Sequence, residues 1–384
     1  MEVGSAVLLT IAVLMSATFL ILLLGPSQTF KDTPLRPCYF YLTTNLPSFI
    51  ARTSRAILGE RITSVIKRVF NYCFCSANPF LQILLVLLVL GGLVAFFADA
   101  WPLLPNKHIH YPISVAIILS TIVSYVAVCR SDPGYISAAN IERAMALYPP
   151  DGIIFSKDLS NVCRTCQLPK PGRSKHCSLC NRCVTAADHH CAWISNCVSL
   201  ANVRLFMAFL LSISIMCGYG GYLIYQVFAH LRVERGLIGR RVYHYATDTW
   251  IEISWLDGMR ILSLDLPYLA ATGILITIMS PMLLVFTSFF IYPIIFKGMT
   301  ANEEAKWDEL AELVTDGQVH VVEMISSSEE SESEALDGLH ERGRPRRHRR
   351  TRKRLVMDAS EFRNVYDRGW RGNLSLILNP PSLH

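Results

Sequence analysis

The stretch CRTCQLPKPGRSKHCSLCNRCVTAADHHCAWISNC, residues 163–197, holds seven of the twelve cysteines and three of the eleven histidines of this 384-residue chain. Its two Cys-x-x-Cys pairs, with imidazoles between them, have the spacing of tetrahedral zinc sites. Disulfides are the other common use of so many cysteines, and the compartment of the segment decides between the two. If these cysteines and histidines bind metal, the stretch forms a small domain folded around metal ions.

The rest of the chain is apolar, with 52% hydrophobic and only 17% charged residues. A membrane-spanning helix needs about 20 apolar residues. Residues 1–4 contain no Lys or Arg, so we expect a retained span at 5–24 rather than a cleaved signal peptide. The sequence predicts an all-α polytopic membrane protein with about five transmembrane helices, at 5–24, 80–98, 113–129, 205–228 and 266–296.

The positive charges predict the orientation of these spans. Of 36 Lys and Arg residues, 30 lie in segments 25–79, 130–204 and 297–384, and the other six lie in 99–112 and 229–265. Cytosolic loops are enriched in Lys and Arg, so we expect the first group in the cytosol and the amino terminus in the lumen. The cytosol is reducing, which favours metal binding or reactivity over disulfides for the clustered cysteines.

These boundaries predict the domain organisation. We expect a transmembrane helix at 1–24, a cytosolic basic loop at 25–79, two transmembrane helices with a short lumenal loop at 80–129, a cytosolic zinc-binding Cys-rich domain at 130–204 between the third and fourth spans, two transmembrane helices at 205–296 with a lumenal loop at 229–265, and a cytosolic tail at 297–384. Residues 326–354 run from acidic to strongly basic, which predicts a disordered linker. Residues 51–70 fit either a helix on an anionic membrane surface or a plain connector.

A count of ligands suggests chemistry beyond metal binding. The stretch offers ten Cys and His side chains, whereas two closed tetrahedral sites use eight. A carboxylate, an imidazole and a thiol lie side by side between Asp188 and Cys191, and together they have the parts of an activated nucleophile. The count leaves open which two groups are spare. Bracketing by spans disfavours a nucleic-acid-binding zinc finger, and a docking module that only binds zinc remains the alternative to an enzyme.

The pattern Cys-x-x-Cys-x-x-x-Lys-Pro-x-Arg-Ser-x-His-Cys-x-x-Cys-x-x-Cys-Val, followed by Asp-His-His-Cys-x-Trp and Asn-Cys-Val, resembles the Cys-rich domain of DHHC-type protein S-acyltransferases, the palmitoyltransferases. The sequences DPG at 132–134, TANE at 300–303 and NVYDRGWRGN at 364–373 are similar to further motifs of this family, so the resemblance extends over about residues 80–373. The chain departs from the usual family residues at Ala192, Ser195, Ser199 and Ala301.

The resemblance implies roles for individual residues. One zinc ion would be held by Cys163, Cys166, His176 and Cys183, and a second by Cys177, Cys180, His190 and Cys197. Cys191 would then be the nucleophile, His189 its base and Asp188 the group that orients His189. The family reaction implied is a two-step ping-pong transfer from palmitoyl-CoA or another long-chain acyl-CoA, through an acyl-enzyme thioester, to cytosolic juxtamembrane cysteines of membrane proteins. No nucleic-acid partner is expected.

Three further features look most like a fungal branch of the family that resides in the endoplasmic reticulum and acts on SNARE-like proteins. They are the extra first span, the Arg-Ser-Lys-His-Cys sequence and the Asn-x-Tyr-Asp-x-Gly tail. The lipid bilayer is therefore an expected partner, and the endoplasmic reticulum the expected location. For the phosphates of CoA, Arg173, Lys175 and Arg204 are candidates, with solvated surface charge as the alternative.

Overall fold

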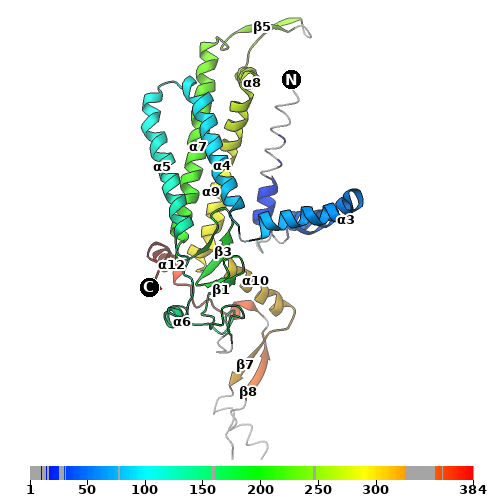
Figure 1. Ribbon diagram of the computed structural model, residues 1–384, viewed down its shortest axis with the longest axis vertical. Helices are drawn as coiled ribbons and strands as arrows, with labels where there is room; N and C mark the ends of the chain where they lie inside the picture. The colour runs from blue at the N-terminus through cyan, green and yellow to red at the C-terminus, as the bar shows by residue number, and fades with distance from the viewer. Residues whose placement is uncertain are drawn as a thin grey trace, which may run out of the picture.

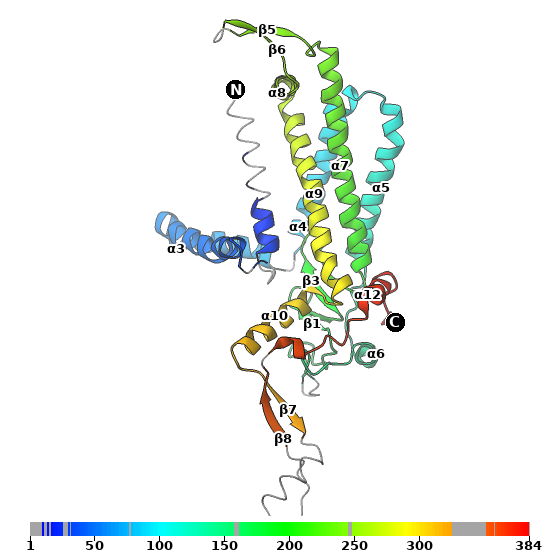
Figure 2. The same cartoon turned by 180° about the vertical axis from the view of Figure 1, so that it is seen from behind.

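The computed structural model describes residues 10, 14, 17–25, 30, 32–76, 78–156, 161–244, 248–324, 351–356 and 358–383. Long helices form an elongated bundle, and a small Cys-rich domain packs with carboxy-terminal elements at one end of it (Figure 1, Figure 2). The prediction of a mostly helical polytopic membrane protein is confirmed. In the described residues, four two-stranded antiparallel sheets add to the helices.

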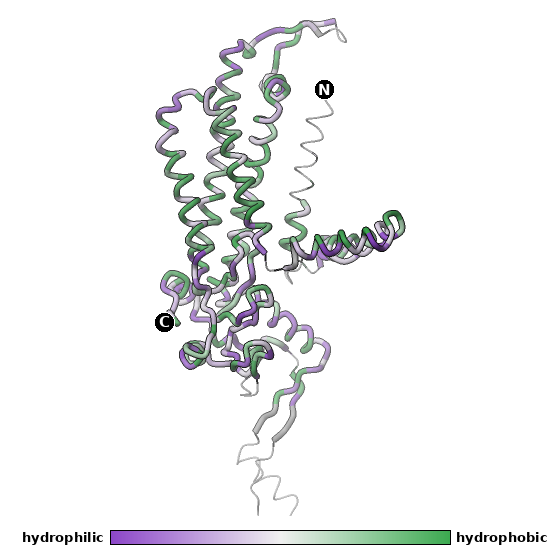
Figure 3. The backbone as a smooth tube through the Cα atoms, in the orientation of Figure 1, coloured by the Kyte–Doolittle hydropathy of each residue, from purple (hydrophilic) through white to green (hydrophobic). Residues whose placement is uncertain are grey.

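Four helices in the described part of the chain are long and apolar enough to cross a bilayer, and they match the second to fifth predicted spans. They are Phe80–Leu103, α5 (Lys107–Arg130), α7 (Val203–Glu234) and α9 (Pro267–Phe296). The first of them joins three elements: α4 (Phe80–Ala95), the short π-helix η3 (Phe96–Ala100) and the 3-10 helix η4 (Trp101–Leu103). Their residues are largely hydrophobic, as helices surrounded by lipid require (Figure 3). Half of the first predicted span, 5–24, lies outside the described residues, and 17–24 is helical.

The central helix α7 contacts α5 and α9. Small residues allow the close approach to α9, because a Cβ on Gly221 would lie 2.4 Å from the Thr277 hydroxyl and one on Gly273 would lie 2.8 Å from Ile224. Close backbone approach of this kind holds helices together in lipid, where the hydrophobic effect between them is absent. This close contact holds α7 and α9 together within the bundle.

Helices also flank the bundle at both ends. On the side of the Cys-rich domain, α2 (Leu35–Phe40), the π-turn η2 (Tyr41–Asn45) and α3 (Leu46–Cys75) fill most of the loop expected at 25–79. At the opposite end, the chain between α7 and α9 forms β5 (Arg241–His244), β6 (Thr249–Glu252) and α8 (Trp255–Asp265) (Figure 1). These elements belong to the segment expected as a lumenal loop.

The Cys-rich domain contains α6 (Ile141–Leu147) and two hairpins. The first pairs β1 (Lys175–Cys177) with β2 (Arg182–Val184), and the second pairs β3 (Ala187–Cys191) with β4 (Asn196–Ser199). Units this small cannot bury enough apolar surface to be stable by themselves and usually need cross-links or metals.

The tail contains α10 (Ala301–Thr315), β7 (His320–Met324), β8 (Thr351–Leu355), the 3-10 turn η5 (Ala359–Glu361) and α12 (Gly369–Leu378). The linker expected at 326–354 needs a correction at its carboxyl end. Residues 325–350 lie outside the described residues, but β8 pairs with β7, so 351–354 is a strand. A partner strand satisfies the backbone of a segment too polar to form a core of its own.

Candidate zinc centres and active site

The first Cys/His set consists of Cys163, Cys166, His176 and Cys183. The Nδ1 atom of His176 lies 3.5, 3.4 and 3.7 Å from the Sγ atoms of Cys163, Cys166 and Cys183. The β1–β2 register places His176 directly opposite Cys183, and the remaining two cysteines come from the loop before β1. The fold therefore brings these four predicted ligands together.

The second set consists of Cys177, Cys180, His190 and Cys197. The Nδ1 atom of His190 lies 3.6, 3.3 and 3.6 Å from the Sγ atoms of Cys177, Cys180 and Cys197. The β3–β4 register places His190 opposite Cys197. The second hairpin thus supplies two ligands of this set, and the first hairpin supplies the other two, Cys177 at the end of β1 and Cys180 in the turn that follows.

Both sets fit zinc. Within each set, the four ligand atoms lie within 4.8 Å of one another. Tetrahedral zinc, with Zn–S of ~2.3 Å and Zn–N of ~2.0 Å, separates its ligand atoms by ~3.5–3.8 Å, close to the separations in both sets. Three thiolates and one imidazole are a common structural zinc site, and four protein ligands leave no position open for water.

The two adjacent histidines of β3, His189 and His190, point to opposite faces of the strand and contact different groups. Successive side chains of a strand point to opposite faces. His190 contacts the cysteines of the second set, whereas the ring of His189 lies 5.7 Å from that of Phe206 in α7 and 5.9 Å from that of Phe290 in α9. His189 therefore faces the bundle, and Cys191, two residues further along the strand, belongs to neither set.

Asp188 and His189 form a close ion pair. The Oδ2 atom of Asp188 lies 2.7 Å from the Nδ1 atom of His189, and the Asp188 side chain is buried. Burial by itself would lower the pKa of His189, but hydrogen bonding to Asp188 and Cys191 outweighs it and raises that pKa to about 9. The imidazolium form is therefore stabilised next to a thiol, which is the arrangement of an activated cysteine nucleophile.

The amino terminus of α10 supports this pair. The backbone N–H of Ala301 donates to Oδ1 of Asp188 at 2.6 Å, and the Thr300 hydroxyl donates to the carbonyl of Ala187 at 3.0 Å. Helix amino termini attract anions, so the helix stabilises the carboxylate. Ala301 makes its contact through the backbone, which explains why alanine is accepted where the family usually has threonine.

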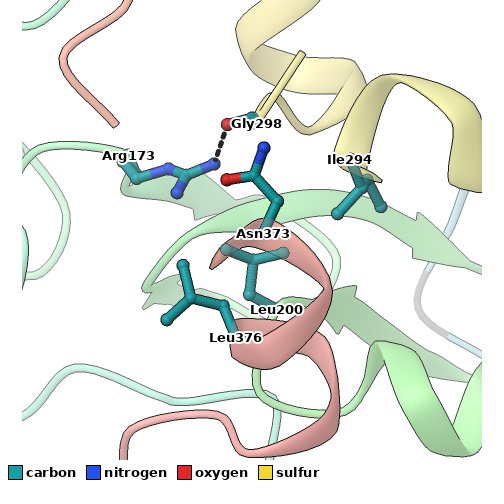
Figure 4. A pocket seen from close by; sticks show the side chains of 6 residues that line it. All are labelled: Arg173, Leu200, Ile294, Gly298, Asn373 and Leu376. Atoms are coloured by element: carbon teal, nitrogen blue, oxygen red, sulfur yellow. Dashed lines mark hydrogen bonds between the residues drawn. The ribbon is translucent and has the colours of Figure 1, made fainter. Parts of the chain in front are cut away.

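A buried ion pair anchors the same helix. Nε and Nη2 of Arg173 donate to the carboxylate of Glu303 at 2.5 and 2.6 Å, and Nη2 also donates to the Gly298 carbonyl at 2.9 Å. Figure 4 shows Arg173 beside a small pocket, with Ile294 from α9 and Asn373 from α12. The side chains of Arg173 and Glu303 are 3% and 2% exposed, so the expectation that Arg173 binds CoA phosphates needs correction. Its partner lies 130 residues away in sequence, where no local pattern reveals it.

The other two CoA candidates differ in their surroundings. Arg204 donates to the carbonyl of Leu378 in the tail at 2.7 Å, whereas Lys175 is exposed on β1. Sequence reasoning also assigned no role to Phe206 and Phe290, because aromatic residues in apolar spans look like ordinary lipid-facing side chains. Their rings pack against the bundle side of His189.

The junction with α5 fixes the position of the Cys-rich domain. Asp132 accepts a hydrogen bond from the N–H of Gly134 at 2.9 Å, and Gly134 has φ 82°, which favours glycine. Asn196 of β4 donates to the carbonyl of Val128, at the end of α5, at 3.2 Å. Ser199, where the family usually has glycine, donates to the proline carbonyl of the Asp-Pro-Gly motif at 2.7 Å.

Comparisons with known proteins agree with this geometry. The family model described as DHHC palmitoyltransferase matches residues 156–308. The palmitoyltransferase swf1 of Emericella nidulans is 31% identical over 325 residues, which cover 84% of this chain and 76% of that protein. The palmitoyltransferase SWF1 of Neurospora crassa is 28% identical, over 96% of this chain and 91% of that protein. The palmitoyltransferase swf1 of Schizosaccharomyces pombe is 27% identical, over 97% and 96%.

Proposed function

Because the chain belongs to the DHHC palmitoyltransferase family, we propose that it transfers a long-chain acyl group from acyl-CoA to cysteines of other membrane proteins, with Cys191 as the carrier. The observation that carries this proposal is the Asp188–His189 pair beside a thiol outside both Cys/His sets. Nucleophile, base and orienting group are then all present in one strand.

In the resting pair the proton of Cys191 already lies on His189, and in the first step the Cys191 thiolate attacks the thioester carbonyl of acyl-CoA. The bond to the CoA sulfur breaks, His189 returns the proton to that sulfur, and the acyl group remains on Cys191. Asp188 holds the imidazole in one tautomer and stabilises its charged form. Base assistance of this kind contributes about 10²–10⁴ in rate.

In the second step, His189 takes the proton of a cysteine on the substrate protein. The substrate thiolate attacks the acyl group on Cys191, and Cys191 leaves as a thiolate that recovers the proton from His189. One thioester replaces another of similar energy, so the enzyme supplies orientation and proton transfer rather than driving force.

The metal sets have a structural role in this proposal. Zinc, when bound, cross-links strands and loops that are too short to fold by packing alone. His190 then fixes β3, and through it the positions of His189 and Cys191 on the opposite face.

Substrates and location follow from the family branch and the charge distribution. Similarity to proteins named SWF1 supports the fungal branch, and we propose membrane proteins with cytosolic juxtamembrane cysteines, SNARE-like proteins among them, as substrates. The endoplasmic reticulum is the proposed location. The Cys-rich domain faces the cytosol and the amino terminus the lumen, in line with the positive charges of 25–79, 130–204 and 297–384.

The test is acylation of the purified full-length protein by an alkyne-tagged palmitoyl-CoA. The wild type should acquire a label that hydroxylamine releases, because hydroxylamine cleaves thioesters. Cys191→Ser should lose this label while it retains two zinc ions per chain. The matched control is Cys38→Ser, which removes an exposed thiol of α2 and should leave the label unchanged.

The alternative is a zinc-dependent docking module without chemistry. Such a module would bind two zinc ions and take up no label in any variant. Label that survives Cys191→Ser would instead show that another cysteine is the nucleophile.

A further inference from the structure

The element α3 is used neither by the metal sets nor by the proposed transfer. Gly59 interrupts it with φ 76° and ψ 167°, a conformation that is essentially confined to glycine. The element therefore consists of two helical arms, 46–58 and 60–75, with a sharp change of direction between them.

Each arm separates apolar from polar residues. Residues three and four positions apart share a face of a helix. In the second arm, the centre of the apolar face consists of Ile62, Val65, Ile66, Val69 and Cys73. The exposed side chains of Phe70 and Tyr72 flank this face. The surface away from it carries Arg61, Ser64, Lys67, Arg68 and Asn71. In the first arm, Phe49, Ile50 and Ile57 lie opposite Ser48, Arg52 and Arg55. Figure 3 shows hydrophobic and hydrophilic residues alternating along α3.

The protein leaves these apolar faces uncovered. Ile57 is 75% exposed, Ile62 53% and Val69 56%. None of the described side chains of α3 is buried. An apolar surface of this extent marks a site of interaction with another apolar phase or molecule.

The charge of α3 favours an anionic partner. It carries five basic residues against a single acidic one, Glu60. Among the described residues, no acidic group pairs with Arg55, Arg61, Lys67 or Arg68. Like charges would repel each other if two copies of the chain met through α3, whereas anionic lipid headgroups attract Lys and Arg.

The position of α3 is continuous with the membrane-spanning surface. Its arms extend sideways from the end of the bundle that carries the Cys-rich domain, across the direction of the spans (Figure 1, Figure 2). It ends at Cys75, shortly before α4 begins at Phe80 and enters the apolar layer. An amphipathic helix at this level lies where hydrocarbon meets headgroups.

We propose that α3 lies flat in the cytosolic leaflet, with the apolar faces of both arms among the acyl chains and its Arg and Lys residues on anionic lipid headgroups. This inference rests on the charge-based orientation and not on the acyl-transfer chemistry. It gives the active-site end of the protein a lipid-bound platform beside the spans.

Site-specific photo-crosslinking of the full-length protein in lipid nanodiscs tests this placement. Ile66 and Ser64 are both exposed but occupy opposite faces of the second arm, so they form a matched pair for replacement by p-benzoylphenylalanine. In phosphatidylcholine nanodiscs that contain phosphatidylserine, mass spectrometry should find lipid adducts at position 66 and far fewer at position 64. Equal lipid adducts at both positions, or adducts at 66 that are mainly with another protein chain, would overturn the proposal.

A charge variant separates anionic lipid from lipid in general. Arg61→Gln, Lys67→Gln and Arg68→Gln combined should shift the equilibrium between membrane-bound and detached α3 by roughly 10²-fold in phosphatidylserine nanodiscs. Each basic residue near an anionic surface strengthens binding by about fivefold, and three are removed. The shift should vanish in pure phosphatidylcholine. Identical behaviour of variant and wild type in both lipids would refute the role of the charges. Retained zinc content shows that the variant is folded.

Discussion

The Arg173–Glu303 pair allows the sharpest prediction about how the tail supports the active site. Its two side chains are 3% and 2% exposed, and Glu303 belongs to the same helix turn that donates to Asp188. Removing one partner of a buried ion pair costs about 3–5 kcal/mol, because the other charge stays buried without compensation. Glu303→Gln should therefore loosen the start of α10 by that amount.

The matched control is Glu304→Gln on the next residue. Glu304 also forms a short ion pair, 2.6 Å from Lys297, but those side chains are 32% and 42% exposed. An exposed pair is worth about 0–1 kcal/mol. The two variants remove the same charge from neighbouring positions and differ mainly in burial.

Amide hydrogen exchange of α10 in nanodiscs measures the effect. If exchange occurs by local opening, Glu303→Gln should accelerate it by roughly 10²–10⁴-fold, and Glu304→Gln by less than about tenfold. Acylation of Cys191 should fall in the first variant only. Equal, small effects of the two substitutions would refute the view that this pair positions Asp188.

Three further predictions concern the catalytic strand, the metals and the junction. Asp188→Asn should lower the rate of acylation by about 10²–10⁴-fold while the zinc content stays the same. The asparagine amide can still orient His189, but it does not stabilise the positive charge of the imidazolium. An unchanged rate in a time course of labelling would exclude the role assigned to Asp188. Cys197→Ser should reduce bound zinc from two ions to one, whereas Cys217→Ser in α7 should keep both, as elemental analysis can check. Gly134→Ala should destabilise the junction by about 1–2 kcal/mol, because φ is 82° and a Cβ would lie 2.4 Å from the Thr185 hydroxyl; thermal unfolding followed by zinc release measures this, and an unchanged midpoint would contradict it.

Local patterns in the sequence predicted much of this architecture. Long apolar runs identify α4, α5, α7 and α9, because a bilayer fixes the length and composition of the helices that cross it. The Cys-x-x-Cys pairs and the family resemblance grouped eight residues that the fold brings into two compact sets. Both signals lie within short windows of the chain.

Contacts between residues that lie far apart along the chain could not be predicted from the sequence. The sequence alone indicated a surface role for Arg173, whereas in the structure it forms a buried ion pair with Glu303. The contact of Ala301 with Asp188 is made by a backbone N–H, which no residue type reveals in a sequence. The division of α3 at Gly59 shifts the phase of its apolar face, so that one continuous helix drawn over 46–75 conceals two amphipathic arms.

The central claim is that Cys191 is free of metal and carries the acyl group. Native mass spectrometry of the full-length protein after brief exposure to palmitoyl-CoA tests it most directly, with peptide mapping to locate the modification. We predict a species that contains two zinc ions and one palmitoyl group on Cys191. An acylated species that has lost a zinc ion, or an acyl group only on other cysteines, would contradict the account.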